Sequence, residues 1–134
     1  MLARRRFLYR SPFVDKPAEE GSRRWLVAEL DRLTSVIVRR RDRRCVTCGE
    51  RRGLQCSHFY SRRHLATRFD LRNCNAMCAD CNRRHNSEPE PYLRFMNELY
   101  GVEAVAELER LRSGRDKVTD EELFATFKRL RQMS

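Results

Sequence analysis

The sequence predicts an α+β fold that is mostly helical, with a small cysteine-clamped unit of two strands and a helix between an N-terminal helix and several C-terminal helices. Two observations lead to this prediction. Two Cys-x-x-Cys pairs, Cys45/Cys48 and Cys78/Cys81, enclose a short stretch with strand-like patterning. Outside these pairs, apolar residues recur at the three-to-four spacing of amphipathic helices. A chain of 134 residues is long enough for one domain with a modest core.

The chain is expected to begin with a tail. Residues 1–18 carry an arginine triplet at positions 4–6 and two prolines, without any apolar period. This composition predicts a basic flexible arm. Residues 19–134 are predicted to form a single domain, with a core unit at 45–86 and supporting helices at 19–42 and 87–132.

The first supporting helix, residues 19–42, follows from apolar residues on one face and charged residues on the other. Its last turn and the residues after it are rich in arginine, which suits a helix C-terminus. The start of this helix, with Trp25 and Leu26, is a candidate surface for a homodimer.

The core unit is predicted to run strand, loop, strand, helix. The first strand covers residues 54–59, and a basic loop or short helical turn covers 60–72. The returning strand covers 74–77, and a helix begins near residue 79, directly at the second cysteine pair, and ends near 86.

The C-terminal part is predicted to contain three helices. Capping-box patterns at Ser87 and Thr119 open the first and the last of them, Gly101 ends the first, and the middle helix covers 102–112. Their apolar stripes are expected to be core rather than a cofactor site. The stripe residues are Leu93, Phe95, Met96, Leu99, Tyr100, Val102, Val105, Ala106, Leu108, Leu111, Leu123, Phe124, Phe127 and Leu130.

The paired cysteines predict a structural zinc site. Two turns that each supply two thiolates close a tetrahedral site, and Gly49 suits the first turn because glycine tolerates positive φ. Three disulfides in a small secreted protein are the alternative. The N-terminus lacks an apolar signal segment, so we expect a reducing, cytoplasmic location. No apolar run approaches membrane-spanning length, so no membrane partner is expected.

The charge predicts a nucleic-acid partner. The chain has 29 Lys+Arg against 19 Asp+Glu, a net charge of +10. Residues 35–86 hold thirteen arginines and four acidic residues, a net +9, so the charge surrounds the cysteines. Guanidinium groups grip phosphate bidentately. The arginines expected to contact DNA phosphates are Arg62, Arg63, Arg68, Arg83 and Arg84.

Between and beside the cysteine pairs lie residues suited to hydrolytic chemistry. His58 comes at the end of the first predicted strand, and an imidazole can take a proton from water near neutral pH. Asn82 directly follows Cys81, and a carboxamide oxygen held there is a suitable hard ligand for Mg²⁺. Such a cation would offset the charge that develops at a phosphate.

This arrangement resembles the HNH, or ββα-metal, nucleases. Their zinc-stapled members have two Cys-x-x-Cys pairs, a general-base histidine between them, a central asparagine, and a final histidine or asparagine after the last cysteine. The resemblance implies that the four paired cysteines bind structural zinc. It also implies that His58 is the base, Asn73 holds the loop, and Asn82 binds a catalytic Mg²⁺ or Mn²⁺.

A closer resemblance, covering residues 33–130, is to the lambdoid phage NinG (Rap) family of recombination nucleases. It implies a structure-selective DNA endonuclease acting on branched intermediates such as Holliday junctions or D-loops, in a phage or prophage protein of a bacterial host. A homodimer would allow symmetric cutting of two strands. The matching segments are Cys45-Val46-Thr47-Cys48-Gly49, His58-Phe59, Arg68-Phe69-Asp70, Asn73-Cys74, Cys78-Ala79-Asp80-Cys81-Asn82, Tyr92, Tyr100-Gly101-Val102-Glu103 and Leu108-Glu109.

The sequence departs from the HNH pattern at Ser57, where many members have an acidic residue or histidine as a second metal ligand. Serine is a weak ligand, so Asp70 and His85 are further candidates for the catalytic cation. Cys56 and Cys74 lie outside the two pairs. They are expected as small buried residues, as neighbours across the two strands, or as a substitute zinc ligand.

The departure at Ser57 favours the alternative function, a non-catalytic zinc-ribbon DNA-binding protein. A third possibility, a disulfide-stapled secreted basic protein, requires that the chain contain neither free thiols nor zinc.

Overall fold

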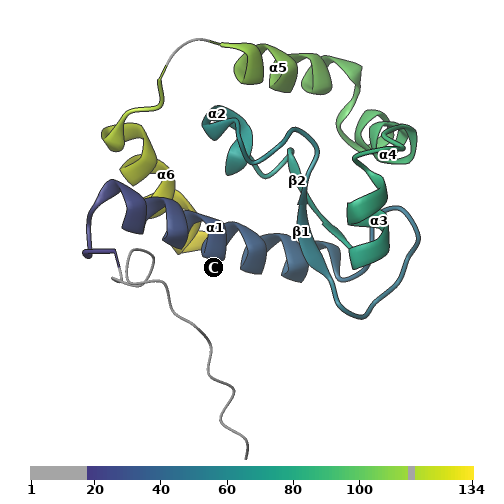
Figure 1. Ribbon diagram of the computed structural model, residues 1–134, viewed down its shortest axis with the longest axis horizontal. Helices are drawn as coiled ribbons and strands as arrows, with labels where there is room; N and C mark the ends of the chain where they lie inside the picture. The colour runs from purple at the N-terminus through teal and green to yellow at the C-terminus, as the bar shows by residue number, and fades with distance from the viewer. Residues whose placement is uncertain (1–17, 115–116) are drawn as a thin grey trace, which may run out of the picture.

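The computed structural model describes residues 18–114 and 117–134, and this part of the chain is mostly helical with one two-stranded hairpin (Figure 1). This confirms the predicted α+β class. Of the predicted basic arm, residues 1–17 lie outside the described residues. The elements are α1 (Arg23–Asp42), β1 (Gln55–His58), α2 (Leu65–Arg68), β2 (Cys74–Met77), α3 (Ala79–Arg84), α4 (Glu90–Tyr100), α5 (Val102–Ser113) and α6 (Asp120–Met133).

Helix α1 begins about one turn later than predicted and ends at the predicted residue. The Ser22 hydroxyl accepts a hydrogen bond from the N–H of Trp25, which caps the helix and fixes its start. At the other end, Arg43 takes a left-handed conformation with φ 63°, and its N–H donates to the carbonyl of Arg39. This closes the helix next to the first cysteine turn.

Helices α1 and α6 lie side by side and share one apolar cluster (Figure 1). The ring of Trp25 lies 5.6 Å from that of Phe127, and Leu26 is only 4% exposed. The chain itself therefore covers the surface that we expected as a candidate dimer contact. The buried members of the cluster are Leu26, Leu30, Leu33, Ile37, Phe69, Leu123, Phe127 and Leu130.

The hairpin places its two faces against different helices. β1 and β2 are antiparallel, with Cys56 opposite Ala76 and His58 opposite Cys74. These four side chains share one face because side chains alternate along a strand. Val38 of α1 packs against Cys74 and Ala76, so this face lies toward α1.

The opposite face of the hairpin carries Ser57 and Asn75 and lies toward α4. The hydroxyl of Tyr92 donates to the carbonyl of Ser57 and accepts from the side-chain amide of Asn75. Met96 lies beside the same amide group. All residues of β2 are buried, so this strand lies at the centre of the unit that the hairpin forms with α1 and α4.

The end of α1 is tied to β2 by polar contacts. The carboxylate of Asp42 accepts a hydrogen bond of 2.8 Å from the N–H of Ala76. The guanidinium of Arg41 donates to the carbonyls of Leu71 and Cys74 at 2.8 and 2.9 Å. Arg41 is therefore a structural residue, and it is not free to bind a ligand.

The C-terminal helices follow the prediction except at one cap. The capping box of Thr119 and Glu122 is present at the start of α6. The box predicted at Ser87 is wrong, because the Ser87 hydroxyl donates to the carbonyl of Arg84 at the end of α3. Helix α4 instead begins after Pro89 without a side-chain cap.

Several residues predicted as core lie at the surface. The exposed fraction is 59% for Leu99 and 67% for Val102, on either side of the bend between α4 and α5. Leu93, Ala106, Leu111 and Phe124 are also exposed. Within the described residues, no helix is both long and apolar enough to cross a membrane.

Candidate metal centre and active site

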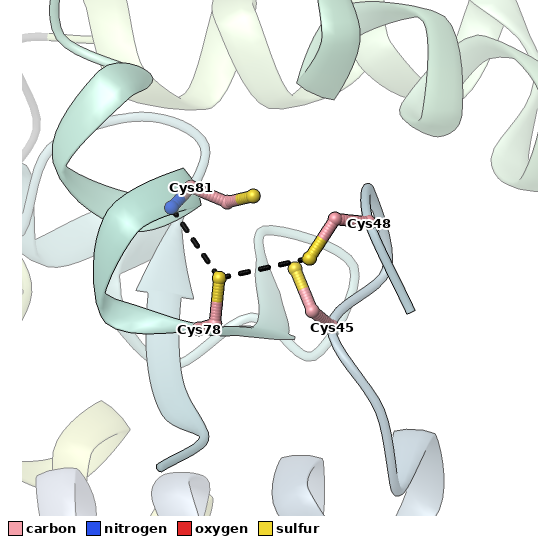
Figure 2. A group of neighbouring side chains, drawn as sticks. All are labelled: Cys45, Cys48, Cys78 and Cys81. Atoms are coloured by element: carbon pink, nitrogen blue, oxygen red, sulfur yellow. Dashed lines mark hydrogen bonds between the residues drawn. The ribbon is translucent and has the colours of Figure 1, made fainter. Parts of the chain in front are cut away.

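The four paired cysteines come together, as predicted, from two separate turns (Figure 2). Their sulfur atoms all lie within 4.8 Å of one another, and the sulfurs of Cys48 and Cys78 are 3.7 Å apart. Cys78 caps α3 and accepts a hydrogen bond from the N–H of Cys81. The first turn closes through Gly49, which has φ 82° and donates its N–H to the carbonyl of Cys45.

The electrostatics of this cluster suit a divalent cation. Burial alone would raise the pKa of Cys45, but hydrogen bonds from Thr47 and from backbone N–H groups lower it to about 6. The hydroxyl of Thr47 also lowers the pKa of Cys81, yet burial and the neighbouring thiols together raise it to about 12. One thiolate forms readily and the next ones are opposed by charge, which a bound Zn²⁺ relieves. The cluster therefore fits a structural zinc ion.

His58 ends β1 with its ring in a defined tautomer. Its Nε2 lies 3.0 Å from the carbonyl oxygen of Arg68. Since a carbonyl can only accept, Nε2 carries the proton and Nδ1 of the neutral ring is an acceptor. Burial lowers the pKa of His58, and the cations of Arg62 and Arg68 act in the same direction. The ring is therefore neutral at physiological pH, with Nδ1 unprotonated.

The Nδ1 atom of His58 remains accessible. It has no hydrogen-bond partner among residues 18–114 and 117–134, and it is not one of the buried polar atoms that lack a partner. The residue as a whole is only half-buried. Nδ1 can therefore take a proton from a water molecule.

Asn73 is fully buried and joins the two ends of the loop between the strands. Its side-chain oxygen accepts from the N–H of Tyr60 at 2.8 Å, and its amide donates to the carbonyls of Tyr60 and Thr67 at 3.0 and 3.1 Å. The loop carries α2, whose last residue, Arg68, supplies the carbonyl that holds His58. Asn73 thus supports the ring of His58 indirectly.

Asn82, in α3, pairs with a residue that the sequence analysis missed. Its amide donates to the side-chain oxygen of Gln55 at 2.9 Å. Gln55 opens β1, and alternation along the strand places it on the face of Ser57, away from that of His58. The alternation of side chains along a strand could have indicated Gln55 from the sequence, because it lies two residues before Ser57 and therefore on the same face.

The three other candidate cation ligands have different surroundings. The carboxylate of Asp70 accepts hydrogen bonds from the backbone N–H and the guanidinium of Arg72. His85 donates from Nε2 to the carbonyl of Phe59, which leaves its Nδ1 buried without a partner among the described residues. The hydroxyl of Ser57 is likewise buried and unpartnered in this part of the chain. Within the described residues, no side-chain hydrogen bond joins any of the three to Asn82, whose amide donates to Gln55.

The predicted DNA-contacting arginines divide into two groups. Arg62 and Arg68 both pair with Asp31 of α1, at 2.9 and 2.6 Å. Arg83 pairs with Asp80 on the surface. Arg63 and Arg84 are exposed and have no acidic partner among the described residues. Asp31 was missed because only the fold brings it to the loop.

Cys56 and Cys74 share the face of His58 and lie outside the zinc cluster. A hydrogen bond from Cys74 lowers the pKa of Cys56, and nearby Arg41 adds to this. The same contact, together with burial, raises the pKa of Cys74 well above its ordinary value. The two thiols are neighbours across the strands on a diagonal, since Cys74 stands directly opposite His58.

A cavity of about 830 Å³ lies between α2, α5 and α6, away from the cysteines. Among the predicted site residues, only Asp70 lines this cavity, and its carboxylate is bound by Arg72. The size of the cavity does not by itself indicate a catalytic site. The ionisable residues around the hairpin remain the stronger candidates for one.

Comparison with known proteins identifies relatives. A family model described as Bacteriophage Lambda NinG protein matches residues 15–133. A curated relative, Protein ninG of Salmonella phage P22, is 29% identical over 92 residues, which cover 65% of this chain and 45% of that protein. The chain thus spans about half the length of this relative. No solved structure gives a significant match.

Proposed function

We propose, from the premise that this chain belongs to the bacteriophage Lambda NinG protein family, that it is a metal-dependent DNA endonuclease of the zinc-stapled HNH type. In this proposal it hydrolyses phosphodiester bonds in branched recombination intermediates, such as Holliday junctions and D-loops. The branched substrate is carried over from the family resemblance described above. The chemistry is argued from the residues of the hairpin.

The observation that carries the proposal is the state of His58. Nε2–H is held by the carbonyl of Arg68, Nδ1 is an accessible acceptor, and burial lowers the pKa. These are the properties of a general base that must take a proton from water at neutral pH. Nδ1 removes the proton as the water oxygen attacks phosphorus, and the loop held by Asn73 keeps the ring in place.

Gln55 and Asn82 are the side chains that would hold the catalytic cation. Both offer carboxamide oxygens, a hard ligand type that Mg²⁺ and Mn²⁺ accept, and their hydrogen bond shows that the two groups reach a common point. Neither carries charge, so much of the cation's coordination would fall to water and phosphate. When bound, such a cation offsets the negative charge that develops at phosphorus and at the leaving oxygen.

The base and the cation ligands lie on opposite faces of β1, so the substrate must reach both. β1 has a strand neighbour on only one side, because the sheet of the described residues has two strands. In our proposal the scissile phosphate lies along the outer edge of β1, between His58 at the strand end and Gln55 at its start. In the same proposal, Arg63 and Arg84, which are exposed and have no acidic partner among the described residues, would bind flanking phosphates.

One observation favours the non-catalytic alternative. Within the described residues, no carboxylate shares a hydrogen bond with the side chain of Asn82, and Asp70 and Asp80 pair with Arg72 and Arg83. A nuclease site with only neutral cation ligands would bind Mg²⁺ weakly. In that case the basic surface would bind DNA without cutting it.

A cleavage assay separates the two functions. Zinc-loaded protein is incubated with supercoiled plasmid, a four-way junction and a linear duplex, each with Mg²⁺, with Mn²⁺, or with a chelator that leaves the structural zinc in place. The proposal expects metal-dependent products, most on the junction, and loss of cutting in Asn82→Ala with retained DNA binding. Binding without products in any metal lane would establish the alternative.

A further inference from the structure

The hairpin face toward α1 gathers three metal-ligating side chains that are separate from the four-cysteine cluster. Cys56 and His58 alternate along β1 onto this face, and Cys74 stands opposite His58 in β2. One ligand atom from each of the three lies within 4.8 Å of the other two, as do the sulfur atoms of the four paired cysteines.

We propose that Cys56, His58 and Cys74 form a second metal site, specific for a thiophilic divalent cation such as Zn²⁺. Two sulfurs and one imidazole nitrogen are the donor set that zinc prefers over Mg²⁺. In a tetrahedral zinc site, Zn–S and Zn–N bonds of about 2.3 and 2.0 Å place neighbouring ligand atoms about 3.5 Å apart. The present separations, all within 4.8 Å, exceed this spacing by at most about 1.3 Å, so a small movement of the three side chains brings them to bonding distance of one ion.

The surroundings of the three residues are already ordered. Cys74 is fully buried, and Val38 and Ala76 pack beside it, which gives the site an apolar floor. The carbonyl of Arg68 accepts from the thiol of Cys74 at 3.2 Å and from Nε2 of His58 at 3.0 Å. One acceptor thus holds two of the ligands together. Binding Zn²⁺ releases the thiol protons of Cys56 and Cys74 to solvent.

Two features make this site different from the four-cysteine cluster. It offers three protein ligands instead of four, which leaves one position of a tetrahedral ion for water. Cys56 and His58 are only half-buried, so the ion can enter from the solvent side.

The site has a consequence for activity, and this part rests on the proposed function. A cation bound by Cys56 and Cys74 takes the imidazole of His58, which then cannot accept a proton from water. Excess Zn²⁺ would therefore inhibit cutting in the presence of saturating Mg²⁺.

The test measures metal binding directly and does not depend on activity. The full chain, loaded with one equivalent of zinc and kept reduced, is titrated with Co²⁺ while thiolate-to-cobalt absorption is followed. We expect wild type to bind a second equivalent and Cys56→Ser to bind none beyond the first. Ser57→Ala, a change on the opposite face of β1, is the matched control and keeps the second equivalent.

A second measurement uses only the wild-type chain, so the test survives if a variant does not fold. Alkylation of Cys56, followed by mass spectrometry, should slow at least tenfold when the second equivalent of Zn²⁺ is added. A wild type that saturates at one equivalent, a Cys56→Ser variant that still binds two, or unchanged alkylation would each overturn the site. A second ion that binds but does not inhibit cutting would leave the site intact and contradict His58 as the base.

Discussion

Asn73 offers the sharpest test of how the fold positions the site. Its side chain is completely buried and makes three hydrogen bonds, to the N–H and carbonyl of Tyr60 and to the carbonyl of Thr67. The substitution Asn73→Ala removes all three and leaves their backbone partners in a space too enclosed for full hydration. We expect this change to loosen the loop that carries α2.

The magnitude follows from those contacts. Each hydrogen bond contributes about 1 kcal/mol net, so Asn73→Ala should lower the free energy of unfolding by about 3 kcal/mol. With a urea dependence of roughly 1.5 to 3 kcal/mol per molar, the unfolding midpoint should fall by about 1 to 2 M. The carbonyl of Arg68 should also lose its fixed position, so cutting should fall more than stability alone explains.

The assay is urea unfolding of zinc-loaded protein, followed by circular dichroism. Asn97→Ala is the matched control, because Asn97 is half-buried in α4 and its side chain makes no hydrogen bond within the described residues. This control should change the free energy of unfolding by less than about 0.5 kcal/mol. An Asn73→Ala protein as stable as the control would refute the role assigned to Asn73.

Three further predictions address the metal, the pH dependence and the ion pairs. Cys48→Ser should lose the zinc ion and lower the melting temperature by more than 10 °C, because α3 and the first turn are joined through the cluster; metal analysis and calorimetry measure this. The pKa of His58 in the folded chain lies below its ordinary value of 6.5, so the unfolded chain takes up this proton first as the pH falls. The contribution of neutral His58 to the free energy of unfolding is therefore complete above pH 6.5 and is lost as the pH falls from 6.5 toward the folded pKa. Urea unfolding across pH should therefore show a decline that His58→Gln reduces, and the acid limb of cutting should lie below pH 6.5. Asp31→Asn should cost about 1 kcal/mol, free Arg62 and Arg68, and steepen the salt dependence of DNA binding, whereas Asp80→Asn on the exposed α3 pair should leave stability within about 0.5 kcal/mol.

Much of the hairpin module could be predicted because the cysteine pairs mark its boundaries. The returning strand at 74–77 and the helix that begins at Ala79 follow from their place before and after Cys78. Gly101 ended α4 as expected because a glycine there can take φ 89°. These features depend on residues close to one another in the sequence.

Other features depend on contacts between distant segments and could not be predicted. Asp31 binds Arg62 and Arg68 only because α1 passes beside the loop between the strands. The partner of Asn82 is Gln55, which requires the position of α3 across β1. The error at Ser87 is of another kind, because both the predicted and the observed contact are local: the hydroxyl donates back to the carbonyl of Arg84 at the end of α3, and α4 begins only at Glu90.

The most direct test of the central claim is the single-turnover cutting rate of a four-way junction by His58→Ala, compared with that of His64→Ala, a change in the loop that follows β1. A positioned general base contributes about 100-fold or more to such a rate, so the first variant should be slower than wild type by at least that factor. The second should cut within about threefold of wild type, and both should retain the zinc ion of the four-cysteine cluster. A His58→Ala protein that cuts as fast as His64→Ala would contradict the account.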